Sequence, residues 1–205
     1  MTSSRIKVLV FGDRRVPRPL VALTPAQVAE PAEIEPAIAD ARRVAVLGSD
    51  ADLAAVLTRL MRSERLDVEV AHVRGGPLSW LRARRAISRP AHRVPLIRDD
   101  TGTALVGSAS WLPPAGAEKL RGEAVVDDVA LFDGEVSGVR IEPTPTMPGL
   151  RATLIGGPRR RWVSGRAAQL GTTGAAVVRD GTPGRREVQR STFYRHTTGW
   201  LRVDC

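Results

Sequence analysis

Two carboxylates and a hydroxyl group meet at one turn of the chain, inside the stretch VAVLGSDADLAAVLTRL. An apolar run ends at this turn and a helical pattern begins, so backbone N–H groups and the positive end of a helix dipole can face an anion there. A carboxylate in such a position can serve as a general base or hold Mg²⁺. The candidate ligand-binding residues at the turn are Gly48, Ser49, Asp50, Ala51 and Asp52, and Asp50 is the catalytic candidate if the protein is an enzyme.

A simpler interpretation of the same turn is a helix cap. Ser49 or Asp50 can accept a hydrogen bond from a backbone N–H of the first helical turn, and Asp52 then lies within that turn. Two acidic side chains at this position also repel a phosphate unless a metal ion intervenes. The spacing alone therefore favours the cap over the phosphate site.

The elements around the turn predict an α/β domain with a parallel sheet. Short apolar runs rich in β-branched residues predict strands at 5–12, 43–48 and 68–73. Between the second and third strands, apolar residues at helical spacing form one face of an amphipathic helix: Leu53, Val56, Leu57, Leu60 and Met61. Strand, helix and strand in this order favour parallel pairing. A further helix before the second strand is shortened or broken by Pro31 and Pro36.

The second half of the chain has a different pattern. After residue 98, short strands alternate with turns rich in Gly, Pro and Asp, and no helical period is sustained. This pattern predicts an antiparallel β-sandwich-like domain at 99–205, which follows the α/β domain at 1–98. The connecting segment 75–93 is expected to carry one basic helix before Pro90. The predicted fold class is therefore α/β plus all-β.

The turn and the order of the domains resemble the diacylglycerol kinase and NAD kinase superfamily. In that family an apolar strand leads into a Gly-Gly-Asp-Gly-Thr motif and then into a helix, and residues 48–52 match that motif. The stretch FDGEVSGVRI at 132–141 is similar to a strand of the family's second domain, and GRAAQLGTTGAAVVRDGTP at 165–183 is similar to its late strands. The resemblance implies a nucleotide domain followed by a β-rich, lipid-facing domain, in a shortened member of the family.

Departures from the family's motifs predict a degenerate nucleotide site. Ser49 and Ala51 replace two glycines that let the backbone approach phosphates, and Asp52 replaces a hydroxyl with a negative charge. The family's next nucleotide element would fall on Gly75 and Gly76, the two further ligand-binding candidates, where the glycines remain but an Asn and an Asp are missing.

A substrate-facing carboxylate of the family is also missing, because Thr182 stands at its position. Phosphoryl transfer depends on positioning and charge neutralisation, and each misplaced group costs roughly 10²-fold in rate. The sequence therefore predicts a pseudokinase, a non-catalytic module that binds a phosphate-bearing ligand, either a nucleotide or an anionic lipid, in a cleft between the halves near 48–52 and 75–76. The alternative is an active lipid or NAD-type phosphotransferase that uses Asp50 with ATP and Mg²⁺ as cofactors.

The chain is strongly basic, and its basic residues are almost all arginine. It has 31 Lys and Arg against 22 Asp and Glu, a net charge of +9, and its lysines are Lys7 and Lys119. A bacterial-type protein from a GC-rich genome has this arginine bias, so a solvated face is favoured over a dedicated nucleic-acid surface. Aromatic residues make up only 4% of the chain, too few for a base-stacking platform. Binding of nucleic acid or an anionic surface stays a second alternative, through the arginines Arg82, Arg84, Arg85, Arg159, Arg160 and Arg161.

Several other classes of protein are disfavoured by the sequence. His72, His92 and His196 lack the spacing of a zinc site, and Cys205 has no partner for an intrachain disulfide. Ser49 lacks the flanking pattern of a hydrolase nucleophile. No apolar run reaches the about 20 residues of a membrane span, and the N-terminus has no signal-peptide pattern, so we expect a cytoplasmic protein. Edge strands in the second half allow a homodimer.

Overall fold

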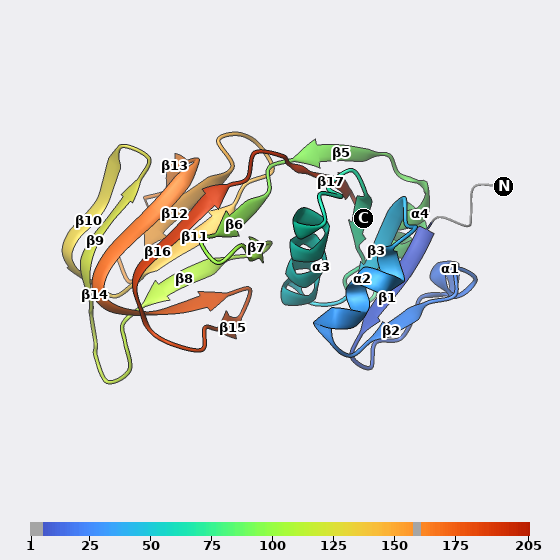
Figure 1. The fold of residues 1–205 in the computed structure, drawn as a ribbon, viewed down its shortest axis with the longest axis horizontal. Coiled ribbons are helices and arrows are strands. Elements are labelled where there is room, and N and C mark those ends of the chain that lie inside the picture. Colours follow the sequence, from blue (N-terminus) through green and yellow to red (C-terminus); the bar gives the residue numbers. More distant parts are fainter. Residues whose placement is uncertain (1–5, 158–160) are drawn as a thin grey trace. The chain divides into compact units, whose positions relative to one another are not determined.

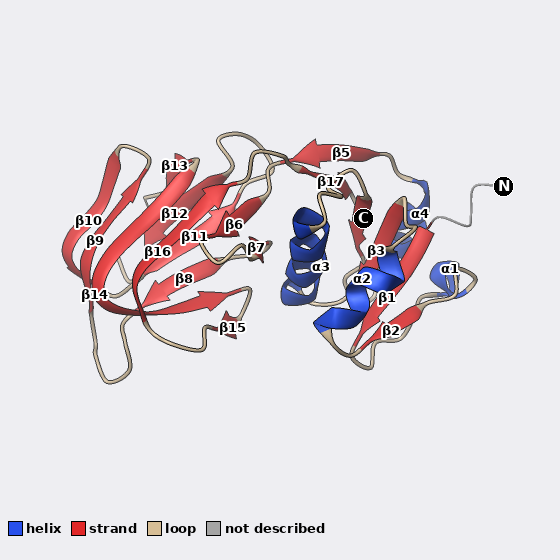
Figure 2. Cartoon of the chain, in the orientation of Figure 1, coloured by secondary structure: helices blue, strands red, loops and turns tan. Residues whose placement is uncertain are grey.

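The structure of the chain is a computed structural model that describes residues 6–157 and 161–205. The chain forms two compact units, and its elements are labelled in Figure 1 and coloured by type in Figure 2. The first unit extends to Val94 and takes up the chain again at Gly199–Cys205, and the second unit is Pro95–Thr198.

A six-stranded sheet forms the centre of the first unit, in the order β2-β1-β3-β4-β17-β5. Its first five strands run parallel, and β5 is antiparallel to β17. The bounds are β1 (Ile6–Phe11), β2 (Ala26–Val28), β3 (Arg43–Leu47), β4 (Glu69–His72), β5 (Ala91–Val94) and β17 (Trp200–Val203). The parallel sheet predicted for this half of the chain is confirmed.

Short helices cover both faces of this sheet. They are α1 (Arg18–Val21), the 3₁₀ helix η2 (Pro31–Glu33), α2 (Ile34–Ile38), α3 (Asp50–Arg62) and α4 (Ser79–Ser88). The predicted apolar face of α3 is confirmed, since none of its five residues is more than 8% exposed. Leu20 of α1 and Ala83 and Ala86 of α4 join one buried cluster with strand residues. Pro31 and Pro36 lie in η2 and in the five-residue α2, as their effect on helices requires.

The last strand of the chain belongs to the first unit. Leu201 of β17 lies opposite Glu69 of β4 and opposite Arg93 of β5. The sequence predicted a strand here but assigned it to the β-rich domain, within 99–205. A four-residue run carries no information about which sheet it joins, because its neighbours come from residues far away in the chain.

The second unit is an antiparallel sheet of eleven strands, with the path β13-β12-β11-β8-β14-β16-β6-β7 and with β9, β10 and β15 attached to it. The bounds are β6 (Ile97–Asp99), β7 (Ala104–Leu105), β8 (Ala109–Leu112), β9 (Leu120–Val126), β10 (Val129–Val136), β11 (Val139–Pro143), β12 (Leu150–Leu154), β13 (Val163–Gly165), β14 (Ala167–Arg179), β15 (Thr182–Pro183) and β16 (Val188–Arg195). The long strand β14 pairs with β9 and β16 in its first part and with β8 and β15 in its last. The predicted β-sandwich-like class is confirmed.

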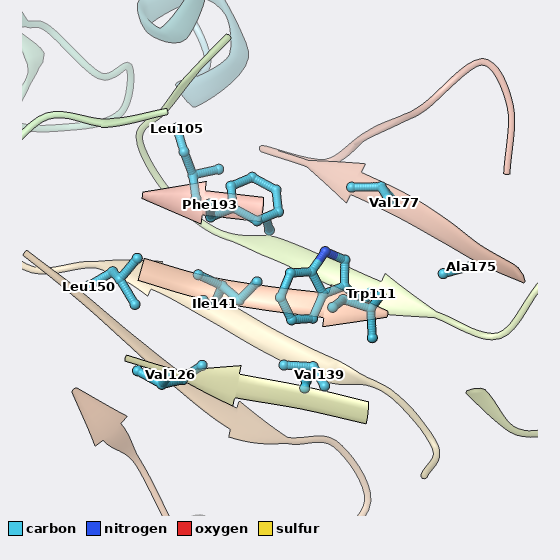
Figure 3. Close-up of a cluster of buried hydrophobic side chains, with 14 of the residues drawn as sticks. Leu105, Trp111, Val126, Val139, Ile141, Leu150, Ala175, Val177 and Phe193 are labelled. Carbon is cyan, nitrogen blue, oxygen red and sulfur yellow. The ribbon is translucent and has the colours of Figure 1, made fainter. Parts of the chain in front are cut away.

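Two aromatic side chains occupy the core of the second unit. Trp111 and Phe193 are fully buried, with ring centroids 6.0 Å apart, and apolar side chains from several strands surround them (Figure 3). The indole Nε1–H of Trp111 donates a 2.9 Å hydrogen bond to the hydroxyl of Ser191. A buried polar atom needs such a partner, so the bond fixes the orientation of the Trp111 ring.

The described residues include no helix that combines the length and the apolar character needed to cross a membrane.

Candidate functional site

The turn between β3 and α3 is a closed helix cap. The hydroxyl of Ser49 accepts the backbone N–H of Asp52 at 3.2 Å. In return, the carboxylate of Asp52 accepts the backbone N–H of Ser49 at 2.7 Å and its hydroxyl at 2.8 Å. This reciprocal arrangement uses N–H groups at the start of the helix that an anion would otherwise bind. The structure therefore has the cap that the sequence favoured, with Ser49 as the capping residue.

The carboxylate of Asp52 also fills the space beside Gly48. A Cβ atom added at Gly48 would lie 2.6 Å from Asp52 Cβ and 2.8 Å from Asp52 Oδ2. A phosphate approaching Gly48 would meet this negative charge at close range. The sequence argument placed added bulk on Ser49 and Ala51 and an added negative charge on Asp52, and the structure has the Asp52 carboxylate beside Gly48.

Asp50 is paired with residues that follow β4. Its Oδ1 accepts a 2.6 Å hydrogen bond from Arg74 Nη2, and His72 Nδ1 lies 3.7 Å from the same oxygen. The other ring nitrogen of His72, Nε2, lies 3.0 Å from the carbonyl oxygen of Gly48. Burial lowers the pKa of His72, and the charge of Arg74 lowers it further, against the raising effects of the Gly48 hydrogen bond and of Asp50 and Asp52. A neutral His72 then donates its Nε2–H to Gly48 and ties the end of β3 to the end of β4.

A small basic pocket lies beside this turn. Its volume is about 230 Å³. It is lined by Arg14, Arg15, Pro17, Leu47, Val73, Arg74, Gly75, Gly76 and Ser79. These residues follow or end β1, β3 and β4, so the pocket lies at the carboxyl ends of parallel strands, where α/β sheets bind ligands. No carboxylate is among the lining residues, and Arg74 links the pocket to the turn through Asp50.

The structure separates the predicted ligand-binding residues into two groups. Gly75 and Gly76 line the pocket, whereas residues 48–52 form the adjoining turn and line no part of it. Arg14, Arg15 and Arg74 are not among the residues predicted from the sequence. A signal for them exists. Arg14 and Arg15 follow one predicted strand after a single intervening residue, Arg74 comes directly after another, and the carboxyl ends of parallel strands meet at one edge.

The predicted basic surface divides in a similar way. Arg82 of α4 donates hydrogen bonds to the carbonyl oxygens of Arg74 and Gly75, at 3.2 and 2.9 Å. It therefore holds two residues of the pocket lining in place. The guanidinium of Arg84 lies 6.0 Å from the ring centroid of Trp80. Arg161 is exposed, and Arg85 belongs to the last turn of α4. The remaining two members of the surface, Arg159 and Arg160, lie outside the described residues.

The carboxylates of the turn do not fit a divalent cation. Mg²⁺ needs an octahedral set of oxygen ligands, usually with one or two carboxylates free to bind it. The Asp50 carboxylate is paired with Arg74. The Asp52 carboxylate accepts hydrogen bonds from Ser49, and Arg14 Nη1 lies 3.9 Å from Asp52 Oδ2. In the part of the chain that the structure describes, no three His, Cys, Asp or Glu side chains come together as a metal site.

Solved structures share the whole architecture of the chain. The chain is similar to a diacylglycerol kinase from Bacillus anthracis, with a TM-score of 0.73 and 11% identity, over 98% of this chain and 96% of that kinase chain. It is also similar to an NAD kinase from Archaeoglobus fulgidus that was solved in complex with ATP, with a TM-score of 0.67 and 15% identity, over 97% of this chain and 93% of that one. The chain has the diacylglycerol kinase and NAD kinase fold.

No protein-family model and no curated protein sequence matches the chain. With identities of 11% and 15%, the likeness establishes the kinase fold and leaves the chemistry to the residues of the site. The resemblance read from the turn and the domain order is thus confirmed at the level of the fold.

Proposed function

We propose that the first unit binds a phosphate-bearing ligand in the basic pocket and does not transfer its phosphoryl group. The observation that carries this proposal is the division of charge at the end of the sheet. Arg14, Arg15 and Arg74 line the pocket without a carboxylate, while Asp50 and Asp52 are held at the turn beside it. On this proposal, the chain has a place for a phosphate at the end of the sheet but lacks the carboxylate arrangement that catalysis needs.

The pocket favours a compact anion. Guanidinium groups match phosphate oxygens with paired donors, and Gly75 and Gly76 leave open space where a Cβ atom would otherwise project. A volume of about 230 Å³ is below the range of about 300–1,000 Å³ that encloses a drug-sized ligand. We infer that the pocket takes one or two phosphate groups, from a nucleotide or an anionic lipid headgroup, and leaves the rest of the ligand outside it.

The loss of catalysis follows from the turn. A nucleotide phosphate at Gly48 would face the Asp52 carboxylate, and Asp50 would have to leave Arg74 before it could bind Mg²⁺ or accept a proton. Phosphoryl transfer relies on prepositioned cations around the phosphate, so this reversed charge works against it. The same geometry argues against the alternative of an active phosphotransferase.

Binding can be tested by calorimetry and thermal shift with pyrophosphate, ADP, ATP and glycerol 3-phosphate. We expect at least one of these to bind the wild type and to raise its melting temperature. The double variant Arg14→Ala/Arg15→Ala should weaken binding at least about tenfold. The variant Arg62→Ala/Arg89→Ala removes the same charge from exposed positions outside the pocket and should bind as the wild type does. Equal weakening by both variants, or no binding at all, would overturn the proposal.

Turnover is tested separately, with ATP, Mg²⁺ and either diacylglycerol or NAD as acceptor. We expect no product above background. A turnover that is lost in a folded Asp50→Asn variant would establish the phosphotransferase alternative instead. Retention of duplex DNA that falls steeply with salt, and that Arg62→Ala/Arg89→Ala weakens as much as Arg14→Ala/Arg15→Ala, would indicate non-specific nucleic-acid binding.

A further inference from the structure

A second and larger hollow lies within the β-rich unit. Its volume is about 720 Å³, within the range of pockets that enclose small-molecule ligands. It is lined by Asp100, Thr101, Thr173, Gly174, Val177, Arg179 and the segment 184–191. All of these residues belong to the second unit, so the hollow is independent of the pocket in the first.

The hollow exists because two long strands separate. β14 and β16 pair continuously from Ala167 opposite Tyr194 to Gly171 opposite Arg190, and their register then shifts before Ala175 meets Val188. Beyond that point β14 pairs with β8 and β15, and the chain between β15 and β16 forms no strand. This segment, residues 184–187, links the end of β15 to the start of β16 (Figure 1). All four of its residues line the hollow.

Positive charge dominates the lining of the hollow. Four arginines face two carboxylates, those of Asp100 and Glu187. The exposed Glu187 carboxylate also accepts a hydrogen bond at Oε1, from the backbone N–H of Ala115 at 2.7 Å. Within the described part of the chain, Arg185, Arg186 and Arg190 make no ion pair. Three exposed guanidinium groups without an ion pair thus gather around one hollow, and the lining keeps more arginines than carboxylates.

The fourth arginine is held in place by a buried carboxylate. Arg179 pairs through Nε with Asp99, a residue with no solvent exposure, and its guanidinium also lies 5.8 Å from the ring centroid of Phe193. The other oxygen of Asp99 accepts hydrogen bonds from Thr101 and from the backbone N–H of Thr103. The Nη1 end of Arg179 lies in the wall beside Gly184, where an added Cβ would be 3.6 Å from it. A donor fixed in this way is preorganised, so a ligand need not order it on binding.

We propose that this hollow binds a ligand with two or more phosphate groups, held by Arg185, Arg186 and Arg190 around the fixed donor Arg179. Arginine forks suit phosphate oxygens, and several of them around one hollow favour a polyanion over a single carboxylate. No aromatic side chain lines the hollow, so it offers no surface for stacking a nucleobase. The phosphates can belong to a soluble molecule or to a lipid headgroup, and the test separates these sources.

The experiment compares two probes on the full chain, inositol hexakisphosphate in solution and vesicles of phosphatidylcholine containing 5% phosphatidylinositol 4,5-bisphosphate. We expect the wild type to bind at least one probe. The variant Arg185→Ala/Arg186→Ala should weaken that binding at least about tenfold, without a change in melting temperature, because both side chains are exposed. Binding of the soluble probe alone would assign a free ligand, and binding of the vesicles with failure of plain phosphatidylcholine vesicles would assign a headgroup.

The matched control is Arg121→Ala/Arg166→Ala, which removes the same charge from exposed positions of the same unit outside the hollow. It should leave binding unchanged. Equal losses in the control and in Arg185→Ala/Arg186→Ala would overturn the proposal, as would binding of neither probe. If only Arg14→Ala/Arg15→Ala abolished binding, the hollow would be excluded while the proposed function of the first unit would stand.

Discussion

Arg74 and Asp50 form the charge pair that decides what the turn can do. Arg74 Nη2 donates to Asp50 Oδ1 at 2.6 Å, across 24 positions of sequence, and so joins the loop after β4 to the first residue of α3. Arg74 also lines the basic pocket. One ion pair therefore restrains both the carboxylate that a kinase would use and a cation that a phosphate would bind.

Because of this pair, substitutions of its two residues should change the affinity for phosphate in opposite directions. Arg74→Ala should weaken pyrophosphate binding more than Arg15→Ala does, because it removes a cation and also releases the negative charge of Asp50 beside the pocket. Asp50→Asn should strengthen binding, because it releases Arg74. Calorimetry on the two single variants and the double variant measures the coupling between them. Weaker binding of pyrophosphate with Mg²⁺ by Asp50→Asn would instead indicate that Asp50 holds a metal ion.

The cap at Ser49 predicts a measurable contribution to stability. Ser49→Ala removes the acceptor for the Asp52 N–H and the hydroxyl that donates to the Asp52 carboxylate, so the free energy of unfolding should fall by about 1 kcal/mol. Ser49→Thr keeps both bonds and serves as the control. Urea denaturation followed by circular dichroism measures the difference. An unchanged midpoint in Ser49→Ala would show that the helix start does not depend on this cap.

Burial of His72 predicts that stability falls in acid. Burial lowers the pKa of His72 in the folded protein, whereas in the unfolded chain it returns to about 6.5. Below about pH 6.5 the unfolded chain thus binds a proton that the folded protein resists, and the free energy of unfolding decreases as the pH falls. The slope for one proton is at most about 1.4 kcal/mol per pH unit. Above about pH 7, His72 is neutral in both states and should contribute no pH dependence to the free energy of unfolding.

The variant His72→Gln tests this origin of the pH dependence. Glutamine can still donate to the Gly48 carbonyl but does not titrate, so urea midpoints between pH 5 and 7 should vary less than in the wild type. His196, whose pKa is also lowered by burial, adds to the slope in both proteins and cancels in the comparison. The control His92→Gln changes a half-exposed side chain. An identical slope in wild type and His72→Gln would assign the acid sensitivity to other groups.

Local patterns in the sequence were sufficient for the elements that position the turn. The apolar spacing from Leu53 to Met61 defines α3, and the runs before it and after it define β3 and β4, because each of these elements buries one continuous stretch of chain. The parallel pairing follows from their order. The capping role of Ser49 also follows from residue types three positions apart.

Contacts between distant segments were beyond the same reasoning. The Asp50–Arg74 pair, the filling of Gly48 by Asp52 and the return of β17 to the first sheet depend on side-chain directions and long-range pairing. Arg14 and Arg15 did not stand out in the sequence, because arginine is frequent along the whole chain. Composition therefore drew attention to clusters in sequence, while the pocket is a cluster in space.

The buried bond between Trp111 and Ser191 predicts a cost that depends on its partner. Ser191→Ala leaves the indole N–H without an acceptor in the core, which should lower the free energy of unfolding by about 1–3 kcal/mol. In the background of Trp111→Phe no donor remains, so the same serine substitution should cost less. Urea denaturation of the four proteins completes the cycle, and near-ultraviolet circular dichroism reports the Trp111 environment. Equal costs of Ser191→Ala in both backgrounds would show that the hydroxyl contributes by packing and that its hydrogen bond adds nothing to stability.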